Sequence, residues 1–121
     1  MKLRLLDNSI RLRLNKEDID QLYNNGEVWT TSQLGKTSFV YGVKSIERGE
    51  ISAEMDGNRL QFLLNVDQIK EWVDTSTVGF SAVQKNEDGS SLKLLIEKDF
   101  KCLTDRNEDE SKNFENPNST C

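Results

Sequence analysis

The sequence predicts an α+β fold, in which about eight strands form a mostly antiparallel sheet or barrel accompanied by two short helices. Short runs alternate apolar with polar residues and are bounded by Gly, Asn and Asp, which is typical of hairpin strands. Two segments with helical spacing of apolar residues each follow an Asn, a residue that favours helix N-termini. The order strand, strand, helix, strand, strand occurs twice, which predicts two pseudo-symmetric ββαββ-type halves.

Residues 2–14 are expected to form the first hairpin. Asp7 and Asn8 tolerate the positive φ of a tight turn, and counting outward from them fixes the register. Leucine and isoleucine side chains then share the core face. The other face carries four cations, with Arg4 opposite Arg11 and Lys2 opposite Arg13.

Like charges directly across a strand pair cost a few tenths to about 1 kcal/mol, so this basic face needs counter-charge. Three sources remain open: solvent around splayed side chains, the acidic C-terminal tail folded back over the face, or an external anion or acidic protein surface. The face is therefore the first candidate binding surface: Lys2, Arg4, Arg11 and Arg13.

The first helix is predicted over residues 16–24, capped by Asn15 and ended by the Asn-Asn-Gly run at 24–26. Strands at 27–31 and 38–43 follow around a turn at 34–36. A further hairpin joins strands 50–55 and 59–64 through Asp56 and Gly57.

Asn65 then caps a second helix over 66–74, and strands at 78–83 and 92–97 complete the domain. Three pairs of residues match at a spacing of 50: Asn15 with Asn65, Ile19 with Ile69, and Leu22 with Trp72. The sequence therefore predicts one domain over residues 1–104 with an internal duplication.

Residues 105–121 are expected to be an acidic, polar tail that is mobile or weakly docked. Most carboxylates of the tail lie close together, in a chain of net charge −5. They indicate a solvated charge run, a weak cation site, or a segment that docks onto the basic hairpin face. The candidate tail contacts are Asp105, Glu108, Asp109 and Glu110.

Little in the sequence indicates catalysis. The chain has no His, and its seven glycines form no phosphate-binding loop. Cys102 and Cys121 are too far apart for a Cys-x-x-Cys motif, which leaves free thiols, a disulfide or shared metal ligation open. We expect no metal and no cofactor, and an enzyme using only carboxylates and Arg is the least favoured class.

The leading hypothesis is a non-enzymatic protein-interaction or accessory module with an unidentified protein partner. The alternative is a small-molecule-binding barrel whose pocket is lined by aromatic residues, although such residues are more often simply packed in a core. The candidate lining residues are Trp29, Tyr41, Trp72 and Phe80.

Composition excludes other classes. An acidic chain is a poor nucleic-acid binder, since that affinity depends on a basic surface. The longest apolar runs are only a few residues, so no membrane contact is expected. The first residues alternate charge with apolar side chains, unlike a secretion signal, and predict a cytoplasmic protein.

Several segments together resemble a family of small uncharacterised bacterial proteins classed as a domain of unknown function. The resemblance rests on residues 2–4, 8–14, 78–80, 97–103, 108–110 and 114–117, where Glu115 stands in place of a family proline. It implies a bacterial cytosolic protein, and it brings no activity, ligand or catalytic residue.

Overall fold

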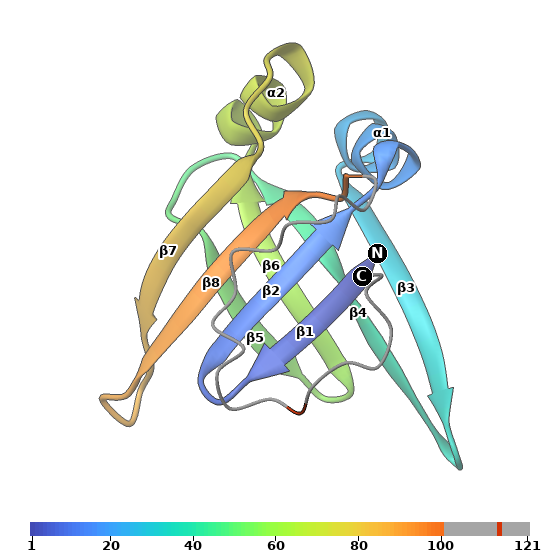
Figure 1. Cartoon of the computed structure of the whole chain (residues 1–121), viewed down its shortest axis with the longest axis vertical. Helices are drawn as coiled ribbons and strands as arrows, with labels where there is room; N and C mark the ends of the chain where they lie inside the picture. Colours follow the sequence, from blue (N-terminus) through green and yellow to red (C-terminus); the bar gives the residue numbers. More distant parts are fainter. Residues whose placement is uncertain (101–113, 115–121) are drawn as a thin grey trace.

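The computed structural model describes residues 1–100 and Phe114. The described chain forms two four-stranded mixed sheets and two helices (Figure 1). The predicted α+β class is confirmed. The elements are β1 (Lys2–Leu6), β2 (Ser9–Leu14), α1 (Lys16–Asn25), β3 (Glu27–Leu34), β4 (Thr37–Ile46), β5 (Ser52–Asp56), β6 (Arg59–Asn65), α2 (Val66–Asp74), β7 (Gly79–Lys85) and β8 (Ser91–Lys98).

The strand orders are β1-β2-β8-β7 and β3-β4-β6-β5. All four hairpin pairs are antiparallel, but the central pairs, β2 with β8 and β4 with β6, are parallel. The strands belong to two separate sheets, so the closed-barrel form of the prediction is wrong. The parallel centre follows from the helix connections, because β2 and β6 both run toward the helices and β8 and β4 return in that same direction.

The two halves of the chain contribute equivalently to the sheets. Each sheet combines the first hairpin of one half with the second hairpin of the other. The registers also correspond: Leu12 pairs with Ile96 in one sheet, and Phe62 pairs with Val43 in the other. Both halves therefore place core residues at the same points of their sheets.

Both helices begin with the caps that the sequence predicts. The Asn15 side chain accepts a hydrogen bond from the Asp18 amide at 2.9 Å, and Asp18 accepts one from the Asn15 amide at 3.0 Å. Asn65 caps α2 by accepting from the Gln68 amide at 2.9 Å. These bonds satisfy amides that have no partner inside the helix, so each strand-to-helix junction is locally determined.

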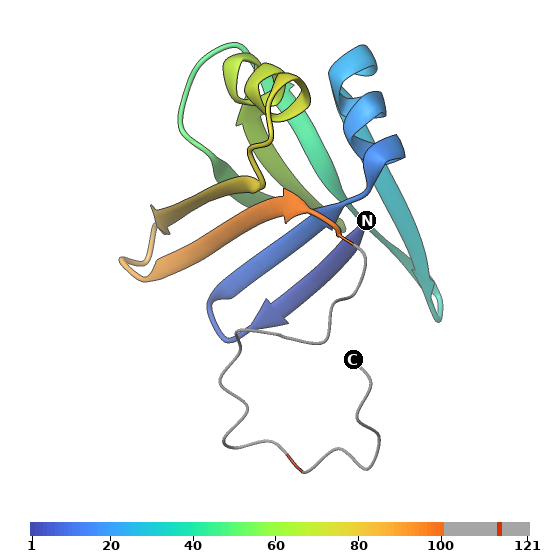
Figure 2. The same ribbon diagram turned by 45° about the horizontal axis from the view of Figure 1, so that its top comes forward.

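The core lies between the two sheets and beneath the helices, which sit at the same end of the molecule (Figure 2). Trp72 is fully buried, packs edge-on against Phe80, and donates from Nε1 to the Val78 carbonyl oxygen at 3.0 Å. Ile19 and Ile69 are buried from the two helices. Far from the helices, Leu5 and Met55 face inward from their strands yet remain 62% and 57% exposed.

Candidate functional site

The outer face of the β1-β2-β8-β7 sheet is strongly cationic. Side chains alternate between the two faces of a strand, and the buried residues Ile10, Leu12 and Ile96 mark the inner face. The opposite positions on the four strands hold six cations and one carboxylate, that of Glu97. We call this surface the cationic face; its cations are Lys2, Arg4, Arg11, Arg13, Lys85 and Lys93.

The structure brings together the four cations that the sequence predicted as one face. Arg4 lies opposite Arg11 and Lys2 opposite Arg13, which is the register that the Asp7-Asn8 turn predicted. Asp7 has the positive φ that this turn needs. The parallel neighbour β8 extends the face, because Lys93 pairs with Ser9 at the far end of β2.

Glu97 is the counter-charge at the centre of this face. Its Oε1 accepts hydrogen bonds from Nε of Arg11 at 2.6 Å and from Nε of Arg13 at 3.0 Å. Nη2 of Arg11 lies 2.5 Å from the same oxygen. The Glu97 side chain is only 15% exposed, so its charge is partly shielded from solvent and acts more strongly on both guanidinium groups.

A second carboxylate lies just beyond the end of β8. Oδ2 of Asp99 is 3.0 Å from Nζ of Lys2. Among the described residues, Glu97 and Asp99 therefore supply counter-charge to the basic hairpin. The tail residues, which are one of the three sources of counter-charge that the sequence left open, lie outside the described residues, as do both cysteines.

Gly79 gives Glu97 the room that it occupies. The two residues are opposite each other in the β7–β8 pair. A Cβ on Gly79 would lie 2.2 Å from the Ile96 carbonyl oxygen and 2.7 Å from both Cα and Cβ of Glu97. Any side chain there would push β7 away from the centre of the cationic face.

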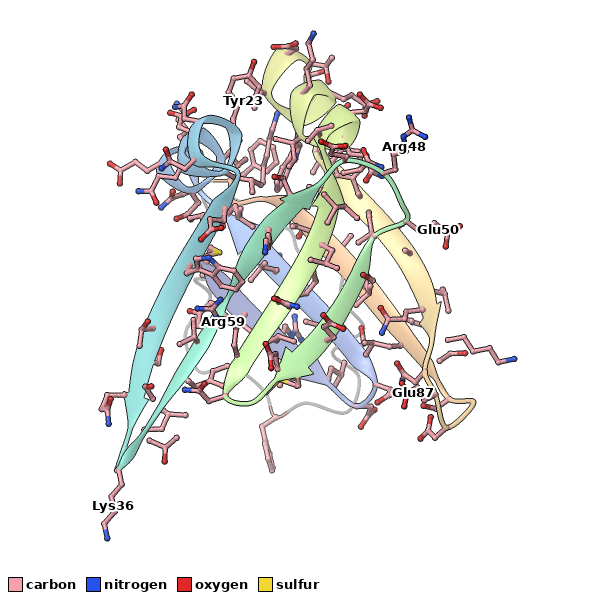
Figure 3. All side chains as sticks on the ribbon, turned by 180° about the vertical axis from the view of Figure 1, so that it is seen from behind. Tyr23, Lys36, Arg48, Glu50, Arg59 and Glu87 are labelled. Carbon is pink, nitrogen blue, oxygen red and sulfur yellow. The ribbon has the colours of Figure 1, made fainter. Side chains whose placement is uncertain are left out.

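The outer face of the other sheet has a different chemistry (Figure 3). Cations and carboxylates are nearly balanced on its strands, with Lys44 and Arg59 against Glu27, Glu54 and Asp56. The guanidinium of Arg59 stacks 4.3 Å above the ring of Trp29. Nε1 of Trp29 donates to Glu27 at 3.1 Å.

The four aromatic residues predicted to line one pocket are in three different places. Trp29 is on an outer face, opposite Gly42. Tyr41 faces inward from the same sheet, where its hydroxyl donates to the Met1 carbonyl oxygen at 3.3 Å. Only Trp72 and Phe80 meet, with ring centroids 5.9 Å apart in the core.

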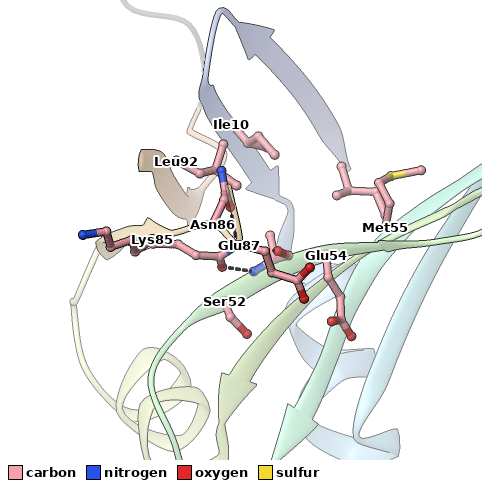
Figure 4. Close-up of a pocket in the computed structure, with 11 residues that line it drawn as sticks. Ile10, Ser52, Glu54, Met55, Lys85, Asn86, Glu87 and Leu92 are labelled. Atoms are coloured by element: carbon pink, nitrogen blue, oxygen red, sulfur yellow. Dashed lines mark hydrogen bonds between the residues drawn. The ribbon is translucent and has the colours of Figure 1, made fainter. Parts of the chain in front are cut away.

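Two hollows lie along the seam between the edge strands β5 and β7, and none of those aromatic residues lines them. Their volumes are ≈ 590 and ≈ 670 Å³. The larger lies toward α2 and includes Gln68, whose Oε1 is buried without a hydrogen-bond partner among the described residues. Figure 4 shows the smaller, which has an apolar floor of Ile10, Leu60 and Leu92 and a rim that includes Glu54, Lys85 and Glu87.

No polar or charged residue among residues 1–100 and Phe114 is fully buried, and no three His, Cys, Asp or Glu side chains among them gather closely enough to hold a metal ion. The pKa of Asp88 is lowered, first by a hydrogen bond from the Ser90 hydroxyl and then by one from the Ser90 amide. Asp88 lies in the exposed β7–β8 turn, directly after Glu87, which lines the smaller hollow.

Neither α1 nor α2 is long and apolar enough to cross a membrane, and residues 1–100 contain no other α-helix.

Sequence reasoning found the cations of β1 and β2 but missed Glu97, Asp99, Lys93 and Lys85 as members of the same surface. The alternation in residues 92–97 was the available signal, since it places Glu97 and Lys93 on one side of a strand. Nothing local indicated that this strand would lie beside β2.

Comparisons with known proteins give a family without an assigned activity. The model of a family of unknown function matches residues 1–118. No curated protein matches the chain, and no solved structure does.

Proposed function

Since the chain belongs to the family of unknown function DUF7009, we propose its role from geometry: a non-enzymatic interaction module that binds an acidic protein segment on the cationic face. The observation that carries the proposal is a concentration of charge. Six cations share the strands of one face with a single carboxylate, although the chain as a whole has a net charge of −5.

Such an asymmetric distribution favours a protein partner with the opposite potential. Complementary patches steer association and suppress wrong partners. Arginine suits this role, because its planar guanidinium donates two hydrogen bonds to one carboxylate. Exposed Leu6 and Val83 lie on the same face and add apolar contact area that a purely electrostatic surface would lack.

The acidic tail is a candidate competitor for this face. Asp105, Glu108, Asp109 and Glu110 have the charge that the face would attract, and they belong to the same chain. We propose that a partner segment and the tail bind to overlapping parts of the cationic face. A chain ending at residue 103 should then bind an acidic peptide more tightly than the full chain does.

The first test uses a synthetic peptide of alternating Glu and Ser residues, added to the isotopically labelled full chain at low salt. Backbone amide resonances of β1, β2 and β8 should shift, and added salt should reverse the shifts, because exposed charges are screened. Shifts confined to other strands, or no shifts, would overturn the proposal.

Matched variants locate the binding surface. Lys93→Glu reverses a charge on the cationic face, whereas Lys36→Glu makes the same change at the tip of the β3–β4 hairpin (Figure 3). We expect Lys93→Glu to weaken peptide binding several-fold and Lys36→Glu to leave it unchanged. Equal losses would show a general effect of net charge. A single-stranded oligonucleotide is tested in the same assay. If it binds more tightly than the peptide, the proposed partner is wrong in kind, and the cationic face binds a nucleic acid instead of an acidic protein segment.

We also propose that the two halves descend from one duplicated ββαββ unit. Equivalent strand order, equivalent registers and the paired Asn caps support this origin.

A further inference from the structure

We infer that Glu97 is a positioning residue for the cationic face: it holds the Arg11 and Arg13 side chains in the one arrangement that an acidic partner meets. The inference rests on the proposed function and names the residue that organises the binding surface. Glu97 itself belongs to β8, a strand that reaches β2 only in the folded chain.

The geometry shows how one carboxylate organises two arginines. Arg11 and Arg13 are successive outward positions on β2, and like charges at such positions repel each other. A single oxygen, Oε1 of Glu97, accepts from Nε of both. Each guanidinium is thereby fixed at its inner edge, and the two groups converge instead of splaying apart.

Burial makes this arrangement persistent. The side chains of Arg11 and Arg13 are 27% and 29% exposed, and that of Glu97 is 15% exposed. Ion pairs open to solvent are weak because water and salt screen them, whereas a partly buried pair with several hydrogen bonds is screened less. We therefore expect the Arg11, Arg13 and Glu97 side chains to keep this arrangement in solution, as residues of the folded core do.

Ordered arginines bind a partner at lower cost. A free Arg or Lys side chain loses substantial rotamer entropy when a partner immobilises it, and ordering before binding removes part of that loss. Glu97 neutralises one charge of the face, and in exchange two guanidinium groups start from fixed positions. The gain in binding free energy comes from the positions of the two guanidinium groups. Variants that change these positions without changing the net charge can therefore separate it from the effect of charge.

Asp99 supplies the matched control. Within residues 1–100 it makes one ion pair, with Lys2, whose side chain is 71% exposed and can adopt other conformations. Asp99→Asn and Glu97→Gln change the net charge equally, but only the second removes the bridge between Arg11 and Arg13. Glu97→Asp keeps the charge and shortens the side chain by one methylene, so it alters geometry alone.

The experiment uses the full chain and two readouts. Without any partner, NMR of the arginine Nε–H groups should show distinct, slowly exchanging signals from Arg11 and Arg13. Glu97→Asp and Glu97→Gln should lose these signals, and Asp99→Asn should retain them. With the alternating Glu-Ser peptide, Glu97→Asp should bind about three- to tenfold more weakly than the wild-type chain, and Asp99→Asn should bind up to about threefold more tightly.

Two results would overturn the inference. One is a Glu97→Asp variant that retains both Nε–H signals and binds like the wild type. The other is an equal gain in affinity for Glu97→Gln and Asp99→Asn, which would show that Glu97 acts only through its charge. Backbone spectra of each variant verify that the domain remains folded. A wild-type chain that does not bind the peptide would overturn the proposed function instead. The Nε–H signals are measured without peptide, so they test the role of Glu97 even if peptide binding fails.

Discussion

Gln84 on β7 binds the main chain of Ala53 on β5 through both ends of its carboxamide. Its Oε1 accepts from the Ala53 amide at 2.8 Å, and its Nε2 donates to the Ala53 carbonyl oxygen at 2.9 Å. These are the two hydrogen bonds that a neighbouring strand would make, so one side chain joins the edges of the two sheets. The hollows on the seam include residues next to this bridge.

Gln84→Ala should therefore destabilise the domain by about 1–3 kcal/mol, because both main-chain groups of Ala53 lose their partner. Denaturant unfolding followed by circular dichroism measures the change. Gln61→Ala is the control: in the part of the chain that the structure describes, the Gln61 side chain bonds to Glu54 alone, on an exposed surface. Its loss should therefore cost less than about 0.5 kcal/mol. Equal losses of unfolding free energy in the two variants would show that the Gln84 bridge stabilises the domain no more than an exposed side-chain hydrogen bond does.

Trp72→Leu tests the core beneath α2, since Leu22 occupies the equivalent place in α1. The variant should lose about 2–4 kcal/mol, because it leaves a cavity beside Phe80 and removes the donor to the Val78 carbonyl oxygen. Thermal unfolding of the variant would show the loss. Stability equal to that of the wild type would mean that the core closes around the smaller side chain.

The two helix caps should differ in strength. Asn65 also donates from Nδ2 to the Gly49 carbonyl oxygen at 3.0 Å, which ties α2 to the β4–β5 loop. Asn15→Ala should cost about 1 kcal/mol, and Asn65→Ala should cost more because it removes the cap and this tether together. Unfolding curves of the two variants make the comparison, and the prediction fails if Asn15→Ala is the more damaging.

The Asp88 carboxylate should titrate below its ordinary range in the wild-type chain and closer to it in Ser90→Ala. Ser90 donates to Oδ1 from its hydroxyl at 2.6 Å and from its amide at 2.9 Å, and the substitution removes the first of these. Carbon-detected NMR of the side-chain carboxyl group measures both pKa values. A wild-type pKa at or above the ordinary value would contradict the prediction.

The direction of this pKa shift sets its effect on stability. A carboxyl group whose folded-state pKa is depressed favours the folded state above the unfolded-state pKa, and that contribution disappears as the pH falls through the folded-state pKa. The β7–β8 turn should thus be better ordered at neutral pH than in acid. Hydrogen exchange of the Ser90 amide is measured at neutral pH and in acid, below the pKa of Asp88 in the folded state. After correction for intrinsic rates, exchange should be slower at neutral pH.

Local features of the fold could be predicted from the sequence. The first hairpin has the predicted register, and α2 covers the predicted residues 66–74. Turn residues, caps and alternation act over a few positions, so short segments determine them. The second strand pair was predicted too short, because β4 continues through Lys44 to Ile46, where the polar residues weaken the alternation.

Long-range pairing could not be predicted in this way. Arg13 and Glu97 are 84 positions apart, and their contact depends on β8 lying parallel to β2 in one register. No local pattern distinguishes that neighbour from an antiparallel one. The cations of the face were therefore visible in the sequence, whereas the carboxylate that organises them became visible only in the fold.

The exchange of hairpins between the sheets makes the two halves mutually dependent in folding. Neither half can complete a sheet by itself, because each central parallel pair takes one strand from each half. A chain emerging from the ribosome must retain its first hairpin without its final neighbour until β8 has been synthesised. Such distant pairing slows folding, and it predicts that the domain is lost in one cooperative step, with no intermediate in which a single half stays folded.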